Sequence, residues 1–459
     1  MSANTEMGRF SVDGARVVVL GAARSGVAAA ELLARRGARV ILSDIRDSIN
    51  EADRLAAAGV ALELGGHRPE TLVDAELIVL SPGVSPRLPV VDRARQRGTP
   101  VISEVELAAR WLRGRIVAVT GTKGKTTTTV LTGQMFQADG HHTLVGGNVG
   151  TALSSQVDMS APDVVHVVEM SSFQLELTET FRPWIAVMLN LSPDHLDRHA
   201  SFGEYVEAKA RIFANQTSSD AMVINADDPH VLEIARRGRA RRLMFAVSHP
   251  IDEGVVVVDG RVAHRTAEGE RPLLPLSSVR LPGRHLLSDV LAAAAVGTVA
   301  GISPKGMRLA VESFAGLEHT LEAVDEICGI RFVNDSKATN IVAACAAIEC
   351  FDEGLVVILG GRFKGGDLQD LVPALRAKAD AVIAIGEARP QLREALSAHV
   401  KVEDADQMSD AVRQAYAAAR PGGVVLLAPA CASLDMFVDY SERGRAFKRE
   451  VSRLAREQA

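Results

Sequence analysis

The stretch Val119–Thr129, VTGTKGKTTTT, decides how the middle of the chain folds. It continues a β-branched run that begins at Ile116, and the segment after it is expected to be helical to about Ala138. A strand, a tight turn of glycine and threonine, and a helix form the setting of a phosphate-binding loop, because backbone N–H groups and the helix N-terminus face the anion. The usual pattern, G-x-x-x-x-G-K-[ST], would place a glycine at position 119. The loop is therefore a shortened one, with glycines at 121 and 124.

The residue types in this turn match the parts of a nucleoside triphosphate site. Backbone N–H groups of residues 121–125 would face the phosphates, Lys125 would reach the β- and γ-phosphates, and the Thr126 hydroxyl would bind Mg²⁺. The alternative is a threonine-rich helix cap without a ligand, because threonine is a good N-terminal cap. Glycines on both sides of the turn and a Lys-Thr pair in register favour the nucleotide site.

Length and composition limit the remaining classes of function. The 459 residues exceed a single core and suggest about three domains. With 51 basic and 57 acidic residues the net charge is −6, which does not favour nucleic acid or an anionic membrane as a partner. No stretch reaches the ~18 apolar residues of a membrane span, and the N-terminus lacks the apolar segment of a signal peptide. We expect a cytoplasmic monomer, with its four cysteines as buried thiols.

Three times along the chain, short β-branched runs alternate with longer amphipathic stretches. This alternation is typical of α/β units with parallel strands. The first unit opens with a strand at residues 16–20, the second at Ile116 and the third near Phe314, and residues 250–280 look like a β-rich insertion. We therefore predict three α/β domains, with boundaries at 1–107, 108–315 and 316–459.

The first unit holds a pattern with two interpretations. Gly21–Gly26, GAARSG, followed by Asp44, imitates the dinucleotide fingerprint G-x-G-x-x-G with an acid about 20 residues later. Ala23, however, stands where the second glycine would let the backbone approach a pyrophosphate. A nicotinamide cofactor would also leave the loop at 119–129 unexplained. An NAD-dependent dehydrogenase is therefore kept only as the distant alternative.

The shortened loop, TGTxGKTT, resembles the ATP site of the Mur ligases, which build the peptide stem of peptidoglycan, and of folylpolyglutamate synthetase. Four further motifs follow in the family's order: EMSSFQLE at 169–176, SPDHLDRH at 192–199, NDSKATN at 334–340 and APACASLDMF at 428–437. Each motif is modest alone, but the ordered set is specific and spans all three units. The chain resembles the D-glutamate-adding branch of the Mur ligases over nearly its whole length.

The resemblance implies a fold and a reaction. The expected domains are a Rossmann-like domain for a UDP-sugar, a central P-loop ATPase-like domain with a mostly parallel sheet, and a C-terminal Rossmann-like domain for the amino acid. The expected reaction joins D-glutamate to UDP-N-acetylmuramoyl-L-alanine through an acyl phosphate, with ATP converted to ADP and phosphate. A ligase of the same family that adds another amino acid, and a degenerate ligase that only binds a UDP-sugar, are the alternatives.

The resemblance also assigns residues to each substrate. Those implied for catalysis are Lys125, Glu169, His195, Lys209 and Lys337. Those implied for ATP are Gly121, Thr122, Lys123, Gly124, Lys125, Thr126, Thr127, Asp289 and Asp335. The UDP-sugar would contact Ser25, Asp44, Ser81, Pro82, Gly83 and Asn148. D-Glutamate would contact Thr339, Lys364, Ser433, Leu434 and Tyr440, with Lys364 and Ser433 holding its two carboxylates.

Two Mg²⁺ sites are implied, and one of them involves a modified lysine. The metal ligands would be Thr126, Glu169, His195 and Lys209, the last as a carbamate formed with CO₂. Lys209 lies in GEYVEAKARIF, an amphipathic helix in which a lysine is ordinarily solvated surface. A carbamate needs the neutral amine, so the site would have to lower the pKa of Lys209.

The chain departs from the family pattern mainly on the nucleotide side. Lys123 replaces a usual asparagine, Leu286 and Asp289 replace the asparagines of a His-Asn-x-x-Asn motif, and Thr320 replaces a usual arginine. Loss of an arginine and gain of Lys123 would roughly conserve positive charge near the phosphates. Tyr440 stands where a phenylalanine is usual, a change without consequence if only its backbone contacts the amino acid.

Overall fold

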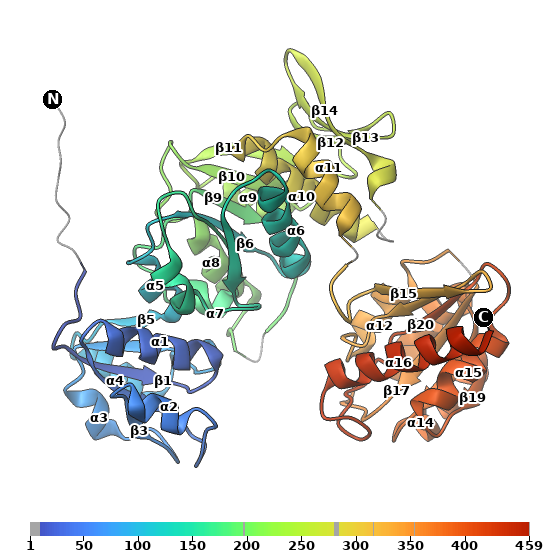
Figure 1. Ribbon diagram of the computed structural model, residues 1–459, viewed down its shortest axis with the longest axis horizontal. Helices are drawn as coiled ribbons and strands as arrows, with labels where there is room; N and C mark the ends of the chain where they lie inside the picture. Colours follow the sequence, from blue (N-terminus) through green and yellow to red (C-terminus); the bar gives the residue numbers. More distant parts are fainter. Residues whose placement is uncertain (1–9, 196–197, 280–283, 315, 353, 459) are drawn as a thin grey trace. The chain divides into compact units, whose positions relative to one another are not determined.

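The computed structural model describes residues 10–195, 198–279, 284–314, 316–352 and 354–458. The chain forms two compact units, here called unit 1, Met1–Val279 with Ser288–Val311, and unit 2, Arg280–Leu287 with Glu312–Ala459. Unit 1 contains two sheets and unit 2 a third, each coloured by its place in the chain in Figure 1. The predicted α/β class with three sheets is confirmed. The predicted boundary at 107/108 falls inside helix α5, Glu104–Ala109.

The first sheet is parallel throughout and has the strand order β3-β2-β1-β4-β5. Its strands are β1 Arg16–Leu20, β2 Arg39–Ser43, β3 Ala61–Glu63, β4 Leu77–Leu80 and β5 Val101–Ser103. Its helices are α1 Arg24–Arg35, α2 Ala52–Ala57, α3 Pro69–Val73, α4 Pro89–Gln96 and α5. Val17 and Val19 pack on the face that α1 covers, whereas Val18 and Leu20 pack on the opposite face. Both faces of β1 are covered, so its sequence is continuously apolar.

The second sheet has nine strands in the order β14-β13-β12-β11-β10-β9-β6-β8-β7. They are β6 Arg115–Thr120, β7 Thr143–Gly147, β8 Val165–Glu169, β9 Ile185–Met188, β10 Ala221–Asn225, β11 Arg241–Phe245, β12 Gly254–Val258, β13 Arg261–Thr266 and β14 Gly269–Pro275. Only the β12–β13 and β13–β14 pairs are antiparallel, which confirms the predicted β-rich insertion. The associated helices are α6 Lys125–Ala138, α7 Ser172–Leu175, α8 Phe202–Ala210, α9 Pro229–Ala235, α10 Arg284–Ala300 and α11 Pro304–Ser313, with 3₁₀ turns at Leu153–Met159, Arg211–Phe213 and Leu276–Ser278.

The third sheet, in unit 2, has the order β15-β16-β20-β17-β18-β19. Its strands are β15 Glu322–Ile327, β16 Ile330–Asn334, β17 Leu355–Gly360, β18 Ala379–Ile385, β19 Lys401–Asp404 and β20 Val424–Leu427, of which only β15 runs antiparallel to its neighbour. The helices are α12 Ile341–Ile348, α13 Val372–Lys378, α14 Arg389–Leu396, α15 Met408–Ala418 and α16 Tyr440–Gln458, with a 3₁₀ turn at Leu368–Leu371. Alternate residues of β17 pack into separate cores on the two faces of the sheet.

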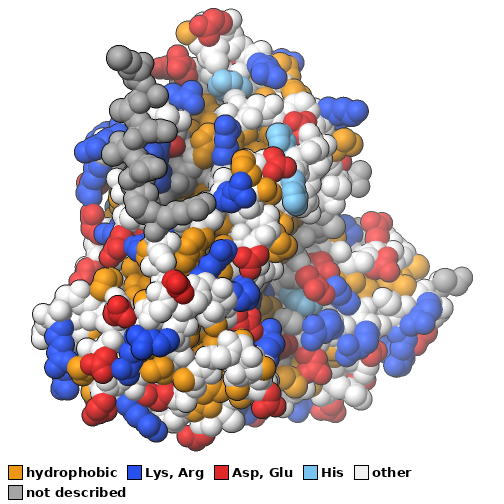
Figure 2. Space-filling view, turned by 60° about the vertical axis from the view of Figure 1, so that its left-hand side comes forward, with side chains coloured by type: hydrophobic (Ala, Val, Ile, Leu, Met, Phe, Trp, Pro, Cys, Tyr) orange, Lys and Arg blue, Asp and Glu red, His pale blue; other side chains and the backbone are white. Residues whose placement is uncertain are grey.

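The surface of the molecule carries charges of both signs (Figure 2). On the face shown in Figure 2, Lys and Arg are interspersed with Asp and Glu, in keeping with the small net charge. No helix within the described ranges is long and apolar enough to cross a membrane.

The expectation of four buried thiols is wrong: only Cys431 is buried, and Cys328 is exposed. Cys328 occupies the two-residue turn between β15 and β16, which explains its exposure.

A buried carboxylate ties α5 to the loop before β9. Glu106 is fully buried and accepts hydrogen bonds from the backbone N–H groups of Glu179, Thr180 and Phe181 and from the Thr180 hydroxyl. Arg110, one turn later, pairs with the same carboxylate at 2.9 Å. Burial by itself would raise the pKa of Glu106, but these donors lower it below its usual value. The stabilising contribution is therefore complete at neutral pH and is lost as the pH falls through this lowered pKa.

We expect Glu106→Gln to lower the free energy of unfolding by about 3 kcal/mol, because it leaves buried donors and Arg110 without their charge partner. Thermal unfolding at pH 7 measures the change. Glu179→Gln is the matched control, since Glu179 is half exposed and pairs with the same Arg110. The difference between Glu106→Gln and wild type should shrink as the pH is lowered. Equal losses in the two variants would contradict the role given to Glu106.

Candidate active site

The predicted phosphate loop joins β6 to α6 and depends on its two glycines. Gly121 has φ +156° and Gly124 has φ +81°, backbone conformations that other residues rarely adopt. A Cβ on Gly124 would lie 2.1 Å from Asp289 Oδ1 and one on Gly121 would lie 2.9 Å from Leu189 Cβ. Both positions therefore require glycine for conformation and for space. The loop is shorter than the usual pattern, and its backbone turns sharply enough to begin a helix directly at Lys125.

Asn190, which follows β9, holds the loop in place and was missed by the sequence analysis. Its side-chain oxygen accepts hydrogen bonds from the N–H groups of Thr122 at 3.1 Å and Lys123 at 2.8 Å. Its amide nitrogen donates to Lys123 O at 3.0 Å. The Thr122 hydroxyl is in turn 2.8 Å from the Tyr205 hydroxyl on α8. The Asn190 amide thus both accepts from and donates to the backbone of the loop, as the backbone of a paired β-strand would.

Lys125 and Thr126 are the first two residues of α6, and their positions are compatible with the roles that the motif predicts. Lys125 Nζ donates to the carbonyl oxygens of Gly121 at 2.9 Å and Thr122 at 2.7 Å. The Thr126 hydroxyl donates to Glu169 Oε2 at 2.7 Å, and Asn148 Nδ2 donates to Glu169 Oε1 at 2.8 Å. Glu169 ends β8, the neighbour of β6 in the sheet, and this adjacency brings the two motifs together.

The oxygen atoms at this point suit Mg²⁺. Thr126 and Glu169 offer one hydroxyl and one carboxylate, and Mg²⁺ is usually held by one or two protein oxygens together with phosphate and water. No group of three or more His, Cys, Asp or Glu side chains among the described residues could hold a metal ion. A cation here would take its remaining ligands from phosphate oxygens and water.

Lys209 is buried and its environment favours the neutral amine. Only 2% of the residue is exposed, whereas a lysine in an amphipathic helix is ordinarily solvated. Its Nζ donates to Gly121 O at 2.8 Å and to Thr120 Oγ1 at 3.3 Å, and lies 4.8 Å from the centre of the Tyr205 ring. Burial, and secondly the charge of Lys125, lower the pKa of Lys209 well below its usual value. The lowered pKa that a carbamate requires is present.

His195 lies in the segment after β9 and has a left-handed backbone conformation, with φ +54°. Its ring is half exposed, packs against Phe173 with centroids 4.9 Å apart, and has Nε2 3.7 Å from Asp194 Oδ2. Two residues of the same motif, 196 and 197, lie outside the described ranges. The exposed imidazole is available to a ligand, which agrees with its predicted role without testing it.

Arg198, three residues after His195, is a second residue that the sequence analysis missed. Its guanidinium donates to Val84 O at 2.8 Å and to Pro82 O at 3.4 Å, and pairs with Glu176 at 3.2 Å. The guanidinium also stacks over the Phe173 ring at 4.6 Å. Arg198 therefore ties the motif that contains His195 to the loop after β4 in the first sheet.

The loops at the carboxyl ends of β1, β2 and β4 surround a cavity of about 400 Å³ in unit 1. The strand order reverses between β1 and β4, and ligands of open α/β sheets bind at such a point. Of the residues predicted for the UDP-sugar, Asp44, Ser81 and Gly83 line the cavity, whereas Ser25, Pro82 and Asn148 do not. Ser25 is buried in the first turn of α1.

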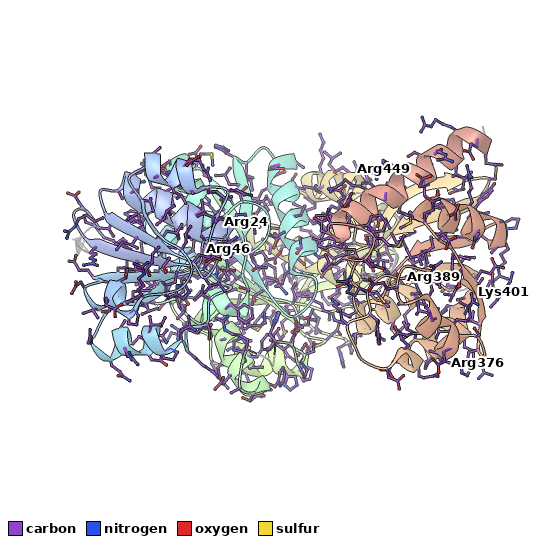
Figure 3. The ribbon with its side chains drawn as sticks, turned by 90° about the horizontal axis from the view of Figure 1, so that it is seen from below. Arg24, Arg46, Arg376, Arg389, Lys401 and Arg449 are labelled. Atoms are coloured by element: carbon purple, nitrogen blue, oxygen red, sulfur yellow. The ribbon has the colours of Figure 1, made fainter. Side chains whose placement is uncertain are left out.

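Two arginines labelled in Figure 3, Arg46 and Arg24, have contacts that bear on this part of unit 1. Arg46 donates two hydrogen bonds to Asp44, which also accepts one from Ala22 N–H. The Arg46 guanidinium and these hydrogen bonds hold the pKa of Asp44 well below its usual range, so the carboxylate stays charged. Arg24, at the start of α1, donates to Asn148 O at 2.9 Å. Asn148 therefore links the first sheet to Glu169.

In unit 2 the predicted residues gather at the carboxyl ends of β16, β17 and β20. Lys364 Nζ donates to Thr339 Oγ1 at 3.3 Å, and Ser433 is buried in the loop after β20. Leu434 and Tyr440 are exposed, and Tyr440 presents its carbonyl oxygen to the Ser336 hydroxyl at 2.7 Å.

Burial shifts the pKa values of two residues predicted for ATP, Asp335 and Asp289. Burial raises the pKa of Asp335 to about 6, opposed by a hydrogen bond from Leu321 N–H and by the charge of exposed Lys337. Asp289 is buried against Gly124, and burial raises its pKa well above the usual value. Burial therefore favours the uncharged acid at this position, where the resemblance leads one to expect a neutral asparagine. Thr127 is buried in the first turn of α6.

Comparisons with known proteins agree over the whole chain. Family models match three segments: the Mur ligase MurD-like N-terminal domain at residues 15–103, the Mur ligase middle domain at 119–297, and the Mur ligase glutamate ligase domain at 321–431. A UDP-N-acetylmuramoylalanine–D-glutamate ligase of Acidobacterium capsulatum is 46% identical over 96% of each chain. One of Koribacter versatilis is 43% identical over 98% of this chain and all of its own.

Solved structures show the same fold at low identity. The UDP-N-acetylmuramate-alanine ligase of Thermotoga maritima matches with a TM-score of 0.60 at 18% identity, covering 96% of this chain and 99% of its own. A pseudomurein peptide ligase of Methanothermus fervidus matches with a TM-score of 0.57 at 18% identity, covering 96% and 100%.

We expect Asn190→Ala to weaken binding of a non-hydrolysable ATP analogue by about tenfold, because the loop loses three hydrogen bonds that preorganise its N–H groups. Isothermal titration calorimetry measures this affinity. Asn215→Ala is the matched control, since the Asn215 amide also donates to loop carbonyls, those of Glu179 and Phe181, away from the phosphate loop. Unchanged affinity in Asn190→Ala would show that the loop holds its shape without the amide.

Proposed function

The chain belongs to the Mur ligase family, and from that premise we propose how its residues perform the family's chemistry. The enzyme joins D-glutamate to UDP-N-acetylmuramoyl-L-alanine with ATP, in the synthesis of peptidoglycan precursors. The observation that carries this function is the near full-length identity of 46% to a ligase of that name. The NAD-dependent alternative is wrong, because the family of the first segment is that of a Mur ligase N-terminal domain.

The reaction has two chemical steps, and both involve anions that repel each other. The alanyl carboxylate attacks the γ-phosphorus of ATP, which releases ADP and gives an acyl phosphate. The amine of D-glutamate then attacks the acyl carbon, phosphate leaves, and the amine proton is lost. Positive groups that face the developing charge are the main means of catalysis for such a transfer.

We assign the phosphates of ATP to the loop at residues 121–125. Asn190 accepts from the N–H groups of Thr122 and Lys123 and so fixes the loop. The remaining N–H groups of the loop would meet the phosphate oxygens, and the Lys125 ammonium would exchange its carbonyl partners for the transferring phosphoryl group. Thr126 and Glu169 would hold Mg²⁺, which supplies charge neutralisation between the phosphates when bound. His195 and a carbamate on Lys209 would hold a second Mg²⁺.

We assign the remaining substrates to the other two groups of strand ends. The UDP-sugar would occupy the cavity beside Asp44, Ser81 and Gly83, with residues 1–107 as its domain. Residues 108–315 would serve ATP, and residues 316–459 would hold D-glutamate near Thr339, Lys364 and Ser433. Asp335 would contact the nucleotide ribose and Lys337 the reacting groups. We propose that the enzyme works in the cytoplasm as a monomer on small-molecule substrates, without nucleic acid or membrane.

Substrate selection tests the function directly. With UDP-N-acetylmuramoyl-L-alanine and ATP, phosphate release is expected with D-glutamate. It should fall at least about 100-fold with D-glutamine, because the Lys364 ammonium or the buried donor at Ser433 would lose its charged partner. A panel of L- and D-amino acids in the same phosphate-release assay measures this selectivity. Omission of the sugar nucleotide is the control. Equal rates with D-glutamine would contradict the assignment of the amino-acid pocket, and a preference for another amino acid would contradict the function.

The modification of Lys209 can be tested by substitution and rescue. Lys209→Arg has a side chain of similar length but cannot form the carbamate, so activity should fall about 100-fold. Lys209→Ala should be as poor and should partly recover with formate or acetate, which supply a carboxylate in the vacated space. Phosphate release measures both effects, and Lys305→Arg on the exposed side of α11 is the control. Full activity in Lys209→Arg would exclude the carbamate.

A further inference from the structure

The C-terminal helix α16 carries a buried arginine that the reaction described above does not use. Arg443 is 1% exposed, and it is the largest of the fully buried side chains among the described residues. No Asp or Glu of the described residues forms an ion pair with it. Burial lowers the pKa of Arg443 to about 10, so the guanidinium is still charged at neutral pH. A buried cation without a carboxylate partner is costly, and its contacts should explain why it is there.

The guanidinium bonds to three separate loops at the carboxyl edge of the third sheet. Nε donates to Ser336 Oγ at 3.0 Å and Nη2 to Ser336 O at 2.9 Å, both in the loop after β16. Nη1 donates to Gly360 O at 3.3 Å, at the end of β17, and to Cys431 O at 3.1 Å, after β20. All four acceptors are neutral oxygens, and the charge of Asp435 acts on the guanidinium without an ion pair. The hydrogen bonds of the arginine therefore serve geometry.

Each of these loops carries a residue proposed to hold D-glutamate or the reacting groups. Ser336 precedes Lys337 and lies three residues before Thr339, Gly360 begins the turn that leads to Lys364, and Cys431 lies two residues before Ser433. The Ser336 hydroxyl also donates to the carbonyl of Tyr440, at the start of α16 itself. One side chain therefore fixes the mutual positions of the three walls of the proposed pocket.

Neighbouring backbone leaves little space around the guanidinium. A Cβ on Gly361 would lie 3.1 Å from Arg443 Nη1 and 2.1 Å from Ala432 O, so only glycine lets the β17 loop approach both. Arg362 and Ala432 exchange backbone hydrogen bonds at 2.8 and 3.0 Å next to this point. The planar fork of arginine can reach three loops at once, whereas the single ammonium of lysine cannot.

We propose that Arg443 is a positioning residue for the amino-acid substrate, which sets the affinity for D-glutamate by holding the loops after β16, β17 and β20 in register. This inference rests on the proposed function, because it takes D-glutamate as the ligand of those loops. Displacement of a binding group by about 1 Å is enough to lose much of its effect, so loosened loops should cost affinity for the amino acid first.

The test compares Michaelis constants for the separate substrates in the phosphate-release assay. Arg443→Lys, which keeps the charge, should raise the KM for D-glutamate about tenfold, and the KM for UDP-N-acetylmuramoyl-L-alanine should stay within about twofold. Ser336→Ala, which removes one acceptor and leaves Arg443 in place, should raise the KM for D-glutamate by a smaller factor. Arg449→Lys is the matched control, an exposed arginine on the same helix (Figure 3).

The outcomes separate this inference from the function on which it rests. If wild-type enzyme releases no phosphate with D-glutamate, the proposed function fails. If wild type is active and Arg443→Lys lowers only kcat or the melting temperature, Arg443 is structural and the inference is overturned. An equal rise of the KM for D-glutamate in Arg449→Lys would overturn it as well. If Arg443→Lys does not fold, an unchanged KM in Ser336→Ala overturns the inference, and a raised KM supports it.

Discussion

Parallel strands force their carboxyl ends to one edge of a sheet, and the chemistry of this protein depends on that constraint. The loop at 121–124 and Glu169 meet because β6 and β8 are neighbours that point the same way. Asp44 and Ser81 meet for the same reason beside β1. In unit 2, the loops after β16, β17 and β20 come together in the same manner. Strand pairing thus brings residues far apart in the sequence to one site, where side-chain bonds such as that of Thr126 to Glu169 join them.

The carbonyl of Gly121 brings two lysines together. Both Lys125 and Lys209 donate to this one oxygen, at 2.9 and 2.8 Å. Burial, and secondly the charge of Lys125, lower the pKa of Lys209 and favour its neutral amine. Lys125 is therefore the lysine whose charge would face a phosphate. The glycine at 121 is therefore important for its carbonyl as well as for its φ angle.

The sequence predicted the elements whose signals are local, and it missed those whose partners are distant. The apolar runs of β1, β6, β8 and β17 are found where expected, because strands covered on both faces have no polar positions. β19, with the sequence KVED, carries no such signal and is identified only by its pairing with β18. The helix pattern alone would make Lys209 ordinary surface, because periodicity does not show which face is covered, and only the family resemblance predicted a site there. Asn190, Arg198 and Arg443 act on backbone carbonyls of remote loops, and no spacing in the sequence reveals such partners.

The contact of Arg24 with Asn148 has a thermodynamic consequence. Asn148 donates to Glu169 with its side chain and accepts from Arg24 with its carbonyl. One residue therefore contacts both the first domain and the carboxylate that suits a divalent cation. A ligand that redirects Arg24 changes the free energy of Asn148 and through it the affinity of Glu169 for a cation. Linkage makes this relation reciprocal: the cation changes the affinity for that ligand by the same factor. The order in which the two bind then alters the route to the loaded enzyme but not its stability.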